Sequence, residues 1–145
     1  DRLSLGDYVE FTGRAADTTV AAILSTADVG ISPDPKNPLN DVSTMNKTME
    51  YMSFELPVVA FDLRETRISA AQAGVYATPN EVPELARLLL ELLEDEERRV
   101  TMGAVGRARV ETELAWRHQA ARYAGVYEHL MTTDNTRAGR RAKGA

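Results

Sequence analysis

Cysteine is absent from the 145 residues, and histidine occurs only at His118 and His129. Without cysteine the chain can form neither disulfides nor thiolate metal sites, and two isolated histidines do not make a histidine-rich metal site. No apolar run approaches the roughly 20 residues that cross a bilayer, and the first residues lack the basic-then-apolar order of a signal peptide. These absences predict a cytoplasmic protein.

Two common phosphate-binding fingerprints are also missing. A dinucleotide site needs G-x-G-x-x-G directly after a strand, whereas Gly103 and Gly106 lie inside a helical pattern. No G-x-x-x-x-G-K-[ST] loop occurs either. Both histidines fall on one C-terminal helical pattern, so no Ser-His-Asp or Cys-His arrangement is indicated. Dinucleotide enzymes, P-loop enzymes and triad hydrolases are therefore disfavoured.

The composition is that of a soluble globular domain, with 43% hydrophobic and 27% charged residues. A net charge of -5 argues against a nucleic-acid module held by phosphate contacts, but one nucleotide can bind through backbone amides. We expect a domain over residues 1–131. Residues 132–145 are small, polar and basic, and we expect a flexible tail there rather than a membrane or polyanion contact.

Strand-like and helix-like patterns alternate along the chain. Expected strands cover residues 8–12, 29–32, 57–61 and 74–78, and expected helices start near Asp17, Thr44, Asn80, Asp95 and Leu114. Asp17, Asn80 and Asp95 are the expected helix caps. The last helix, to about Met131, carries an apolar stripe that we expect to pack: Trp116, Ala120, Tyr123, Tyr127 and Leu130.

Strands that are apolar throughout and alternate with helices predict a parallel sheet covered on both faces, an α/β fold. Ligands of such sheets bind beyond the carboxyl ends of the strands. The segments expected there are residues 13–17, 33–43 and 62–69, the last of which offers Arg64 and Arg67 to the crevice.

The most informative run extends from Thr44 to Pro57 and continues directly into Val58–Asp62. It predicts a helix with a polar start, one inward carboxylate at Glu50, and then a buried strand. The helix N-terminus would point into the crevice, where its free N–H groups favour an anion. An alternative is that Glu50 is a surface acid paired with Lys47, beside methionines that only pack.

Several of these segments occur in the order and spacing of a known family. Residues 9–13, 27–33 and 46–60, together with the helix of Trp116, resemble the C-terminal, donor-binding half of a family 4 glycosyltransferase of the GT-B fold. The resemblance covers roughly residues 5–131. It implies a Rossmann-like half of a GT-B enzyme, a nucleotide diphosphate sugar as donor, most often a UDP-sugar, and retention of anomeric configuration without a metal or other cofactor.

The resemblance also implies site residues. Glu50 matches the second acid of the E-x7-E motif, which bonds the ribose hydroxyls, and a carboxylate accepts both hydroxyl protons. Lys47 is a candidate to join the donors that stabilise the departing diphosphate. Gly13 and Arg14 match the loop near the base. The turn whose amides meet the distal phosphate is matched by Ser43, Thr44, Met45 and Asn46.

Two residues depart from the family pattern. Val42 stands where the first acid of the motif is expected, and the neighbouring Asp41 is the candidate to replace it. Glu55 stands where a glycine usually ends the helix in a left-handed turn. Either the turn differs, or Glu55 accepts a backbone conformation that costs on the order of 1 kcal/mol.

Residues 1–7 resemble only the end of a helix that precedes the matched part in this family. We therefore expect a fragment of a larger enzyme, truncated on its N-terminal side, which lacks the acceptor half and is inactive alone. The acceptor would be a glycan, lipid or small molecule, as in polysaccharide biosynthesis, and the whole protein could touch a membrane peripherally. Two alternatives are a nucleotide-sugar 2-epimerase-like isomerase fragment and a non-catalytic α/β interaction module.

Overall fold

A computed structural model describes residues 4–142, with side chains as far as residue 132. Its centre is a parallel sheet of three strands in the order β1 (Gly30–Ser32), β2 (Val58–Phe61) and β3 (Gly74–Ala77). Ile31 pairs with Val59, and Val59 pairs with Val75. The strands lie within a residue or two of their expected positions, and the α/β fold with a Rossmann-like parallel sheet is confirmed.

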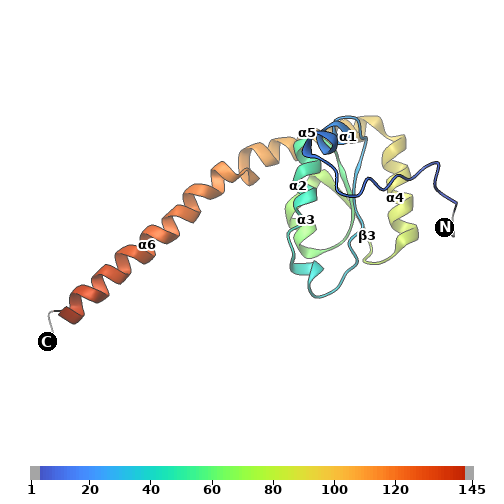
Figure 1. The fold of residues 1–145 in the computed structure, drawn as a ribbon. Coiled ribbons are helices and arrows are strands. Elements are labelled where there is room, and N and C mark those ends of the chain that lie inside the picture. The colour runs from blue at the N-terminus through green and yellow to red at the C-terminus, as the bar shows by residue number, and fades with distance from the viewer. Residues whose placement is uncertain (1–3, 143–145) are drawn as a thin grey trace.

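Both faces of β2 are buried, as its continuous apolar sequence requires. On one face Val59 and Phe61 pack with Leu85 and Leu92 of α4 (Val82–Glu94) and Met102 of α5 (Glu96–Arg109). On the other face Val58 and Ala60 pack against α2 (Asn46–Ser53) and α3 (Arg64–Ala70), which lie side by side along the sheet (Figure 1), through Met52 and Ala70.

Helix α5 crosses the far end of α2 at very short range. An added Cβ at Gly103 would lie 1.9 Å from the Glu55 carbonyl oxygen, so only glycine allows this approach. Gly106 lies against Met52 and Ala73 in the same way. The guanidinium of Arg107 also donates to the Ser53 carbonyl at the end of α2. The two glycines therefore serve helix packing, in keeping with their helical pattern.

The turn after α2 has the left-handed geometry that glycine favours. Glu55 has φ of +60°, Leu56 N–H donates to the Tyr51 carbonyl at 3.0 Å, and Glu55 N–H donates to the Met52 carbonyl at 3.1 Å. These two bonds form a Schellman motif. Of the two expectations for Glu55, the strained backbone is the one observed.

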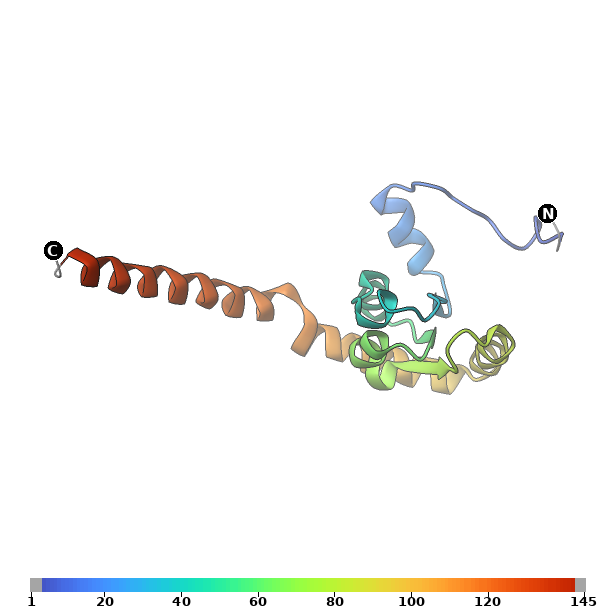
Figure 2. The ribbon, with the colours of Figure 1, turned by 90° about the horizontal axis from the view of Figure 1, so that it is seen from below.

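The expected strand at residues 8–12 is not formed. This segment is turn and irregular chain, its amides at Tyr8 and Val9 both donate to the Leu5 carbonyl, and the Phe11 side chain is 92% exposed. A strand needs a partner, and alternation over a few residues does not supply one. Helix α1 (Asp17–Leu24) follows, and Figure 2 shows it set apart from the sheet.

Of the three expected helix caps, one is formed and two are not. The Asp95 carboxylate accepts the Arg98 N–H at 2.9 Å and caps α5 as expected. Asp17 is the first residue of α1 rather than its cap. Asn80 does not cap α4 either, because its side-chain oxygen accepts the Lys36 N–H at 2.7 Å.

The segment 62–69 was expected to be an irregular connection, but α3 begins within it at Arg64. A 3-10 turn, η2 (Ala71–Ala73), joins α3 to β3, and another, η1 (Asn40–Val42), lies in the long loop after β1.

The chain leaves the α/β core at a π-helical segment, η3 (Val110–Leu114), followed by an extended backbone at Ala115. Helix α6 (Trp116–Ala142) then projects away from the sheet in both views (Figures 1 and 2). Its apolar stripe does not pack on the core as expected, since Trp116 is 67% exposed and the rings of Trp116, Tyr123 and Tyr127 contact one another. The helix also continues past Met131 into the expected tail, whose flexibility stays a prediction.

Candidate functional site

The carboxyl ends of the three strands meet at one edge of the sheet, and the long loop after β1 crosses this edge. Asn80, beyond β3, accepts the Lys36 N–H, and the Asp62 N–H after β2 donates to the Ala77 carbonyl at 2.8 Å. Asn37 folds the loop onto itself by accepting the N–H groups of Leu39 and Asn40. The loop is thus fixed against the sheet edge before it delivers the chain to α2.

Helix α2 presents its N-terminus from this loop. Its N-cap is Met45, which offers no side-chain acceptor to the first turn. A helix leaves its first N–H groups without regular intrahelical partners. In α2 the Thr48 N–H donates to the Met45 carbonyl at 3.0 Å, and no side chain caps the N–H groups before it. Of the expected phosphate turn, Ser43 is used within the loop: its N–H donates to the Asn40 carbonyl at 3.3 Å and its hydroxyl to the Leu39 carbonyl at 2.7 Å. Thr44 and Asn46 are exposed. The helix end is therefore polar, uncapped and accessible.

Glu50 lies one turn further along α2. It was expected to point inward, but it is exposed, because Thr48 and Met52 take the buried positions of the helix. In the described part of the chain its carboxylate has no hydrogen-bond or ion-pair partner. Of the alternative, the surface position of Glu50 is observed, but its pairing with Lys47 is wrong, since Lys47 bonds Asp34. The carboxylate is free to accept hydrogen bonds from a ligand.

Lys47 joins a chain of three side chains at the end of β1. Its ammonium lies 2.8 Å from Asp34 Oδ1 and 2.7 Å from Asp34 Oδ2, and the buried Ser32 hydroxyl donates to Oδ2 at 2.7 Å. Burial alone would raise the pKa of the Asp34 carboxyl, but the hydrogen bonds from Lys47 and Ser32 outweigh it and bring that pKa below its usual value. Asp34 is thus a fixed anion between strand and helix.

Asp41, the candidate to replace the first acid of the motif, is used within the fold. Its Oδ1 accepts the Arg64 N–H at the start of α3 at 3.0 Å and lies 3.4 Å from the Lys36 ammonium. The bond from the Arg64 N–H lowers the pKa of the Asp41 carboxyl most, with help from Lys36. Val42 is exposed and supplies no polar atom. A sugar hydroxyl at this point would share Asp41 with α3.

Arg67, offered by the sequence to the crevice, is held by its neighbours. Its Nε and Nη2 bond the two Asp62 oxygens at 2.6 and 2.7 Å, and the guanidinium lies 4.3 Å from the centre of the Tyr76 ring. Burial raises the pKa of Tyr76 to about 12, and its hydroxyl donates to the Ala71 carbonyl. Arg64 is exposed. The charges of Arg67 and Asp62 largely cancel.

Gly13 and Arg14, expected near the base, lie in the irregular segment before α1. Gly13 has φ of +62° and Arg14 is exposed. Among residues 4–142 no hydrogen bond or ion pair joins either of them to the loop or to α2. The remaining expected site residues lie together on the loop and the first five residues of α2: Asp41, Ser43, Thr44, Met45, Asn46, Lys47 and Glu50.

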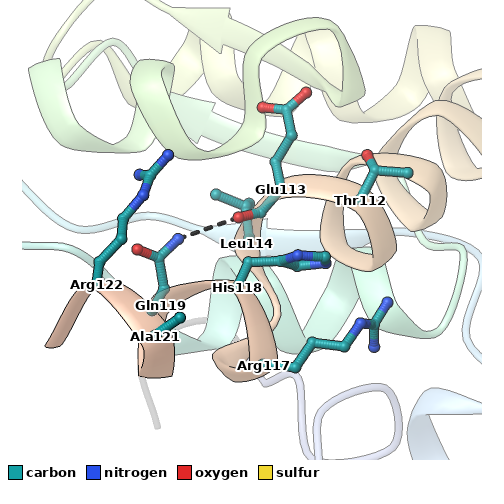
Figure 3. Close-up of a pocket in the computed structure, with 8 residues that line it drawn as sticks. All are labelled: Thr112, Glu113, Leu114, Arg117, His118, Gln119, Ala121 and Arg122. Carbon is teal, nitrogen blue, oxygen red and sulfur yellow. Dashed lines mark hydrogen bonds between the residues drawn. The ribbon is translucent and has the colours of Figure 1, made fainter. Parts of the chain in front are cut away.

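A hollow of about 610 Å³ lies away from this edge, where η3 meets α6 (Figure 3). Its polar side chains serve the helix junction: the imidazole of His118 and the guanidinium of Arg117 bond the Glu111 carbonyl, and Gln119 donates to the Glu113 carbonyl at 3.1 Å. These carbonyls have lost their regular partners because the helix breaks at Ala115. The hollow is a consequence of the break.

A family model described as "Glycosyl transferases group 1" matches residues 1–95, which include the sheet, the long loop and α2. The chain belongs to this family. It is a domain of a glycosyltransferase with the GT-B fold, as its sequence motifs indicated. No solved structure matches this glycosyltransferase domain.

One curated relative of the glycosyltransferase domain is a "GDP-mannose-dependent monoacylated alpha-(1-6)-phosphatidylinositol monomannoside mannosyltransferase" of Corynebacterium glutamicum. The two are 40% identical over 55 residues, which is 38% of this chain and 14% of the relative. The match thus spans about a seventh of the relative's length. None of the helices in the described range is long and apolar enough to span a membrane.

Sequence reasoning missed Ser32 and Asp34 of the glycosyltransferase domain. Both lie at the carboxyl end of the second expected strand, around Pro33, and this is where a parallel sheet places ligand-facing groups. That position was the available signal. The bond from Lys47, thirteen residues further along the chain, gives Asp34 its importance and has no local sequence pattern.

Proposed function

We propose that this glycosyltransferase domain binds the nucleotide diphosphate sugar donor of a retaining, metal-independent transferase. In this proposal the N-terminus of α2 receives the distal phosphate, with the amides of residues 44–46 as donors, and Glu50 bonds the ribose hydroxyls. The Ser43 N–H is not among these donors, because it donates to the Asn40 carbonyl. The observation that carries it is the uncapped N-terminus of α2 at the carboxyl edge of a parallel sheet, one turn before an unpartnered carboxylate.

The chemistry supports each assignment. Free N–H groups at a helix N-terminus and the helix dipole both favour a phosphate. A carboxylate only accepts hydrogen bonds, so the two oxygens of Glu50 suit the two hydroxyls of a ribose. Departure of a nucleoside diphosphate builds negative charge, which dipoles and the Lys47 ammonium would stabilise without any metal. Gly13 and Arg14 would contribute near the base and Asp41 near the sugar.

The donor base is a further part of the proposal. The sequence resemblance favours a UDP-sugar, and the printed name of the Corynebacterium relative specifies GDP-mannose, so both nucleotides belong in the first test. We place the acceptor site on a separate domain of the whole protein. The acceptor would be a glycan, a lipid or a small molecule in the cytoplasm. The present chain would then bind nucleotide without turnover.

The test is isothermal titration of the 145-residue chain with UDP and with GDP, up to millimolar concentration. Binding of either is expected, and Glu50→Gln is expected to weaken it about tenfold, because one lost hydrogen bond to a charged group is worth roughly 1.5 kcal/mol or more. Glu55→Gln is the matched control, since it removes the same charge at the far end of α2. Equal affinities for wild type and Glu50→Gln would refute the ribose assignment.

Metal independence and inactivity of the chain alone are tested separately. Nucleotide affinity is expected to be the same with magnesium and with EDTA. Incubation of the chain with UDP-glucose or GDP-mannose and a panel of acceptors is expected to give no product, and sustained turnover would contradict the assignment of acceptor binding to another domain.

A further inference from the structure

The end of β1 carries a carboxylate, Asp34, to which the proposed function gives no role. Asp34 is held from both sides, by the Ser32 hydroxyl at 2.7 Å and by the Lys47 ammonium at 2.7 and 2.8 Å. Ser32 is 1% exposed and part of the sheet, so its hydroxyl is a rigid support. The three side chains connect the central sheet to the first turn of the helix that faces the crevice.

An isolated lysine at this position would have to be ordered before it could contact a phosphate. Its side chain has four rotatable carbon bonds, and fixing it costs conformational entropy. Here the Lys47 side chain is only 34% exposed, and its ammonium is already fixed by two carboxylate oxygens. An ammonium has three donors, and a ligand that approaches a pre-positioned group does not meet the cost of ordering it.

We infer that Asp34 is a positioning residue that, braced by Ser32, holds the Lys47 ammonium at the phosphate-facing edge of the crevice. The ligand class is the nucleoside diphosphate of the proposed function, and the inference rests on that function. Asp34 itself touches no ligand in this account. It acts through Lys47 alone, and Ser32 acts through Asp34.

Loss of the Asp34 charge can change nucleotide affinity in either of two directions. Asp34 is an anion close to a proposed anion site, so removing its charge by Asp34→Asn would by Coulomb's law strengthen the binding of a diphosphate. If Asp34 positions Lys47, the same substitution weakens binding, because the ammonium loses its fixed partner. The direction of the change therefore separates a positioning role from a simple charge effect.

The experiment is isothermal titration of the full chain with whichever of UDP and GDP binds the wild type. Asp34→Asn and Lys47→Met are each expected to weaken binding about threefold to tenfold, and Ser32→Ala about twofold. In the Lys47→Met background Asp34→Asn is expected to weaken binding no further, because the residues act in series. Asp28→Asn is the control, since Asp28 precedes β1 at the opposite edge of the sheet and its side chain is 67% exposed.

Each outcome has a definite meaning. Unchanged or tighter binding by Asp34→Asn, with wild-type binding intact, overturns the inference and leaves the proposed function standing. Additive losses in the double variant also overturn it. A loss of thermal stability with unchanged affinity of the folded variant shows a structural role only, and counts against it too. Failure of the wild type to bind either nucleotide refutes the proposed function first, and the inference with it.

Discussion

Replacing Glu55 by glycine is expected to stabilise the domain, although it removes a side chain. Glu55 has φ of +60° at the end of α2, in a Schellman turn. A residue with a Cβ pays about 1 to 2 kcal/mol for this conformation. Its negative charge also lies beside the helix C-terminus, which costs a further few tenths of a kcal/mol. Glycine avoids both costs but loses about 0.5 to 1 kcal/mol through the flexibility of the unfolded chain.

The net expectation for Glu55→Gly is a gain of about 1 kcal/mol, which raises the melting temperature by roughly 3 °C in a domain of this size. Urea unfolding followed by circular dichroism measures the free energy, and a thermal melt measures the temperature shift. Glu55→Ala is the control, because alanine removes the charge but keeps the Cβ and hence the strain.

The order of stability should be glycine, then asparagine, then alanine at this position, since asparagine tolerates the left-handed conformation better than alanine. If Glu55→Gly is no more stable than Glu55→Ala, strain at this turn does not limit stability, and the reasoning fails.

Two further predictions concern packing and acid stability. Gly103→Ala would gain about 1 kcal/mol in helix propensity, but its Cβ would lie 1.9 Å from the Glu55 carbonyl oxygen. We therefore expect the free energy of unfolding in urea to fall by about 2 kcal/mol. Gly125→Ala is the control, since no atom lies within 4 Å of its added Cβ, and it should show no loss. Folding lowers the pKa values of four carboxyl groups, those of Asp34, Asp41, Asp62 and Glu84. The stability that these carboxylates add to the folded state is therefore fully present above their unfolded pKa of about 4, and it is lost as the pH falls through their folded pKa values. Unfolding free energies at pH 6 and pH 3 should therefore differ, with a smaller difference in Asp62→Asn; equal values at the two pH values would contradict the assignment.

The sheet was predictable because its strands carry their own signal. Val58 to Phe61 is a continuous apolar run that ends at a polar residue, and such a run in an alternating α/β pattern indicates a strand buried on both faces. The segment from Tyr8 to Thr12 alternates as an exposed strand would, yet it finds no partner in the described chain and stays irregular. The alternation of apolar and polar residues therefore predicted a strand that did not form, because no neighbouring strand in the described range pairs with it.

The candidate site was predictable where it is local and not where it depends on distant contacts. The polar start of α2 and Glu50 follow from one continuous run of residues. The pairing of Lys47 with Asp34 and the bond from the Arg64 N–H to Asp41 join residues that no local pattern connects. Helix α3 was missed for the same reason, because its first N–H is satisfied by Asp41 and not by a neighbour.

The two ends of helix α2 have different surroundings. Its final turn is fixed by Glu55, Gly103 and Arg107 against α5, whereas its first turn emerges from a loop that contributes no large fully buried side chain to the core. Under the proposed function, folding stability and ligand preference belong to opposite ends of a single eight-residue helix. An exchange of residues 35–45 aimed at donor preference would therefore have to keep Asp41, whose carboxylate accepts the Arg64 N–H at the start of α3.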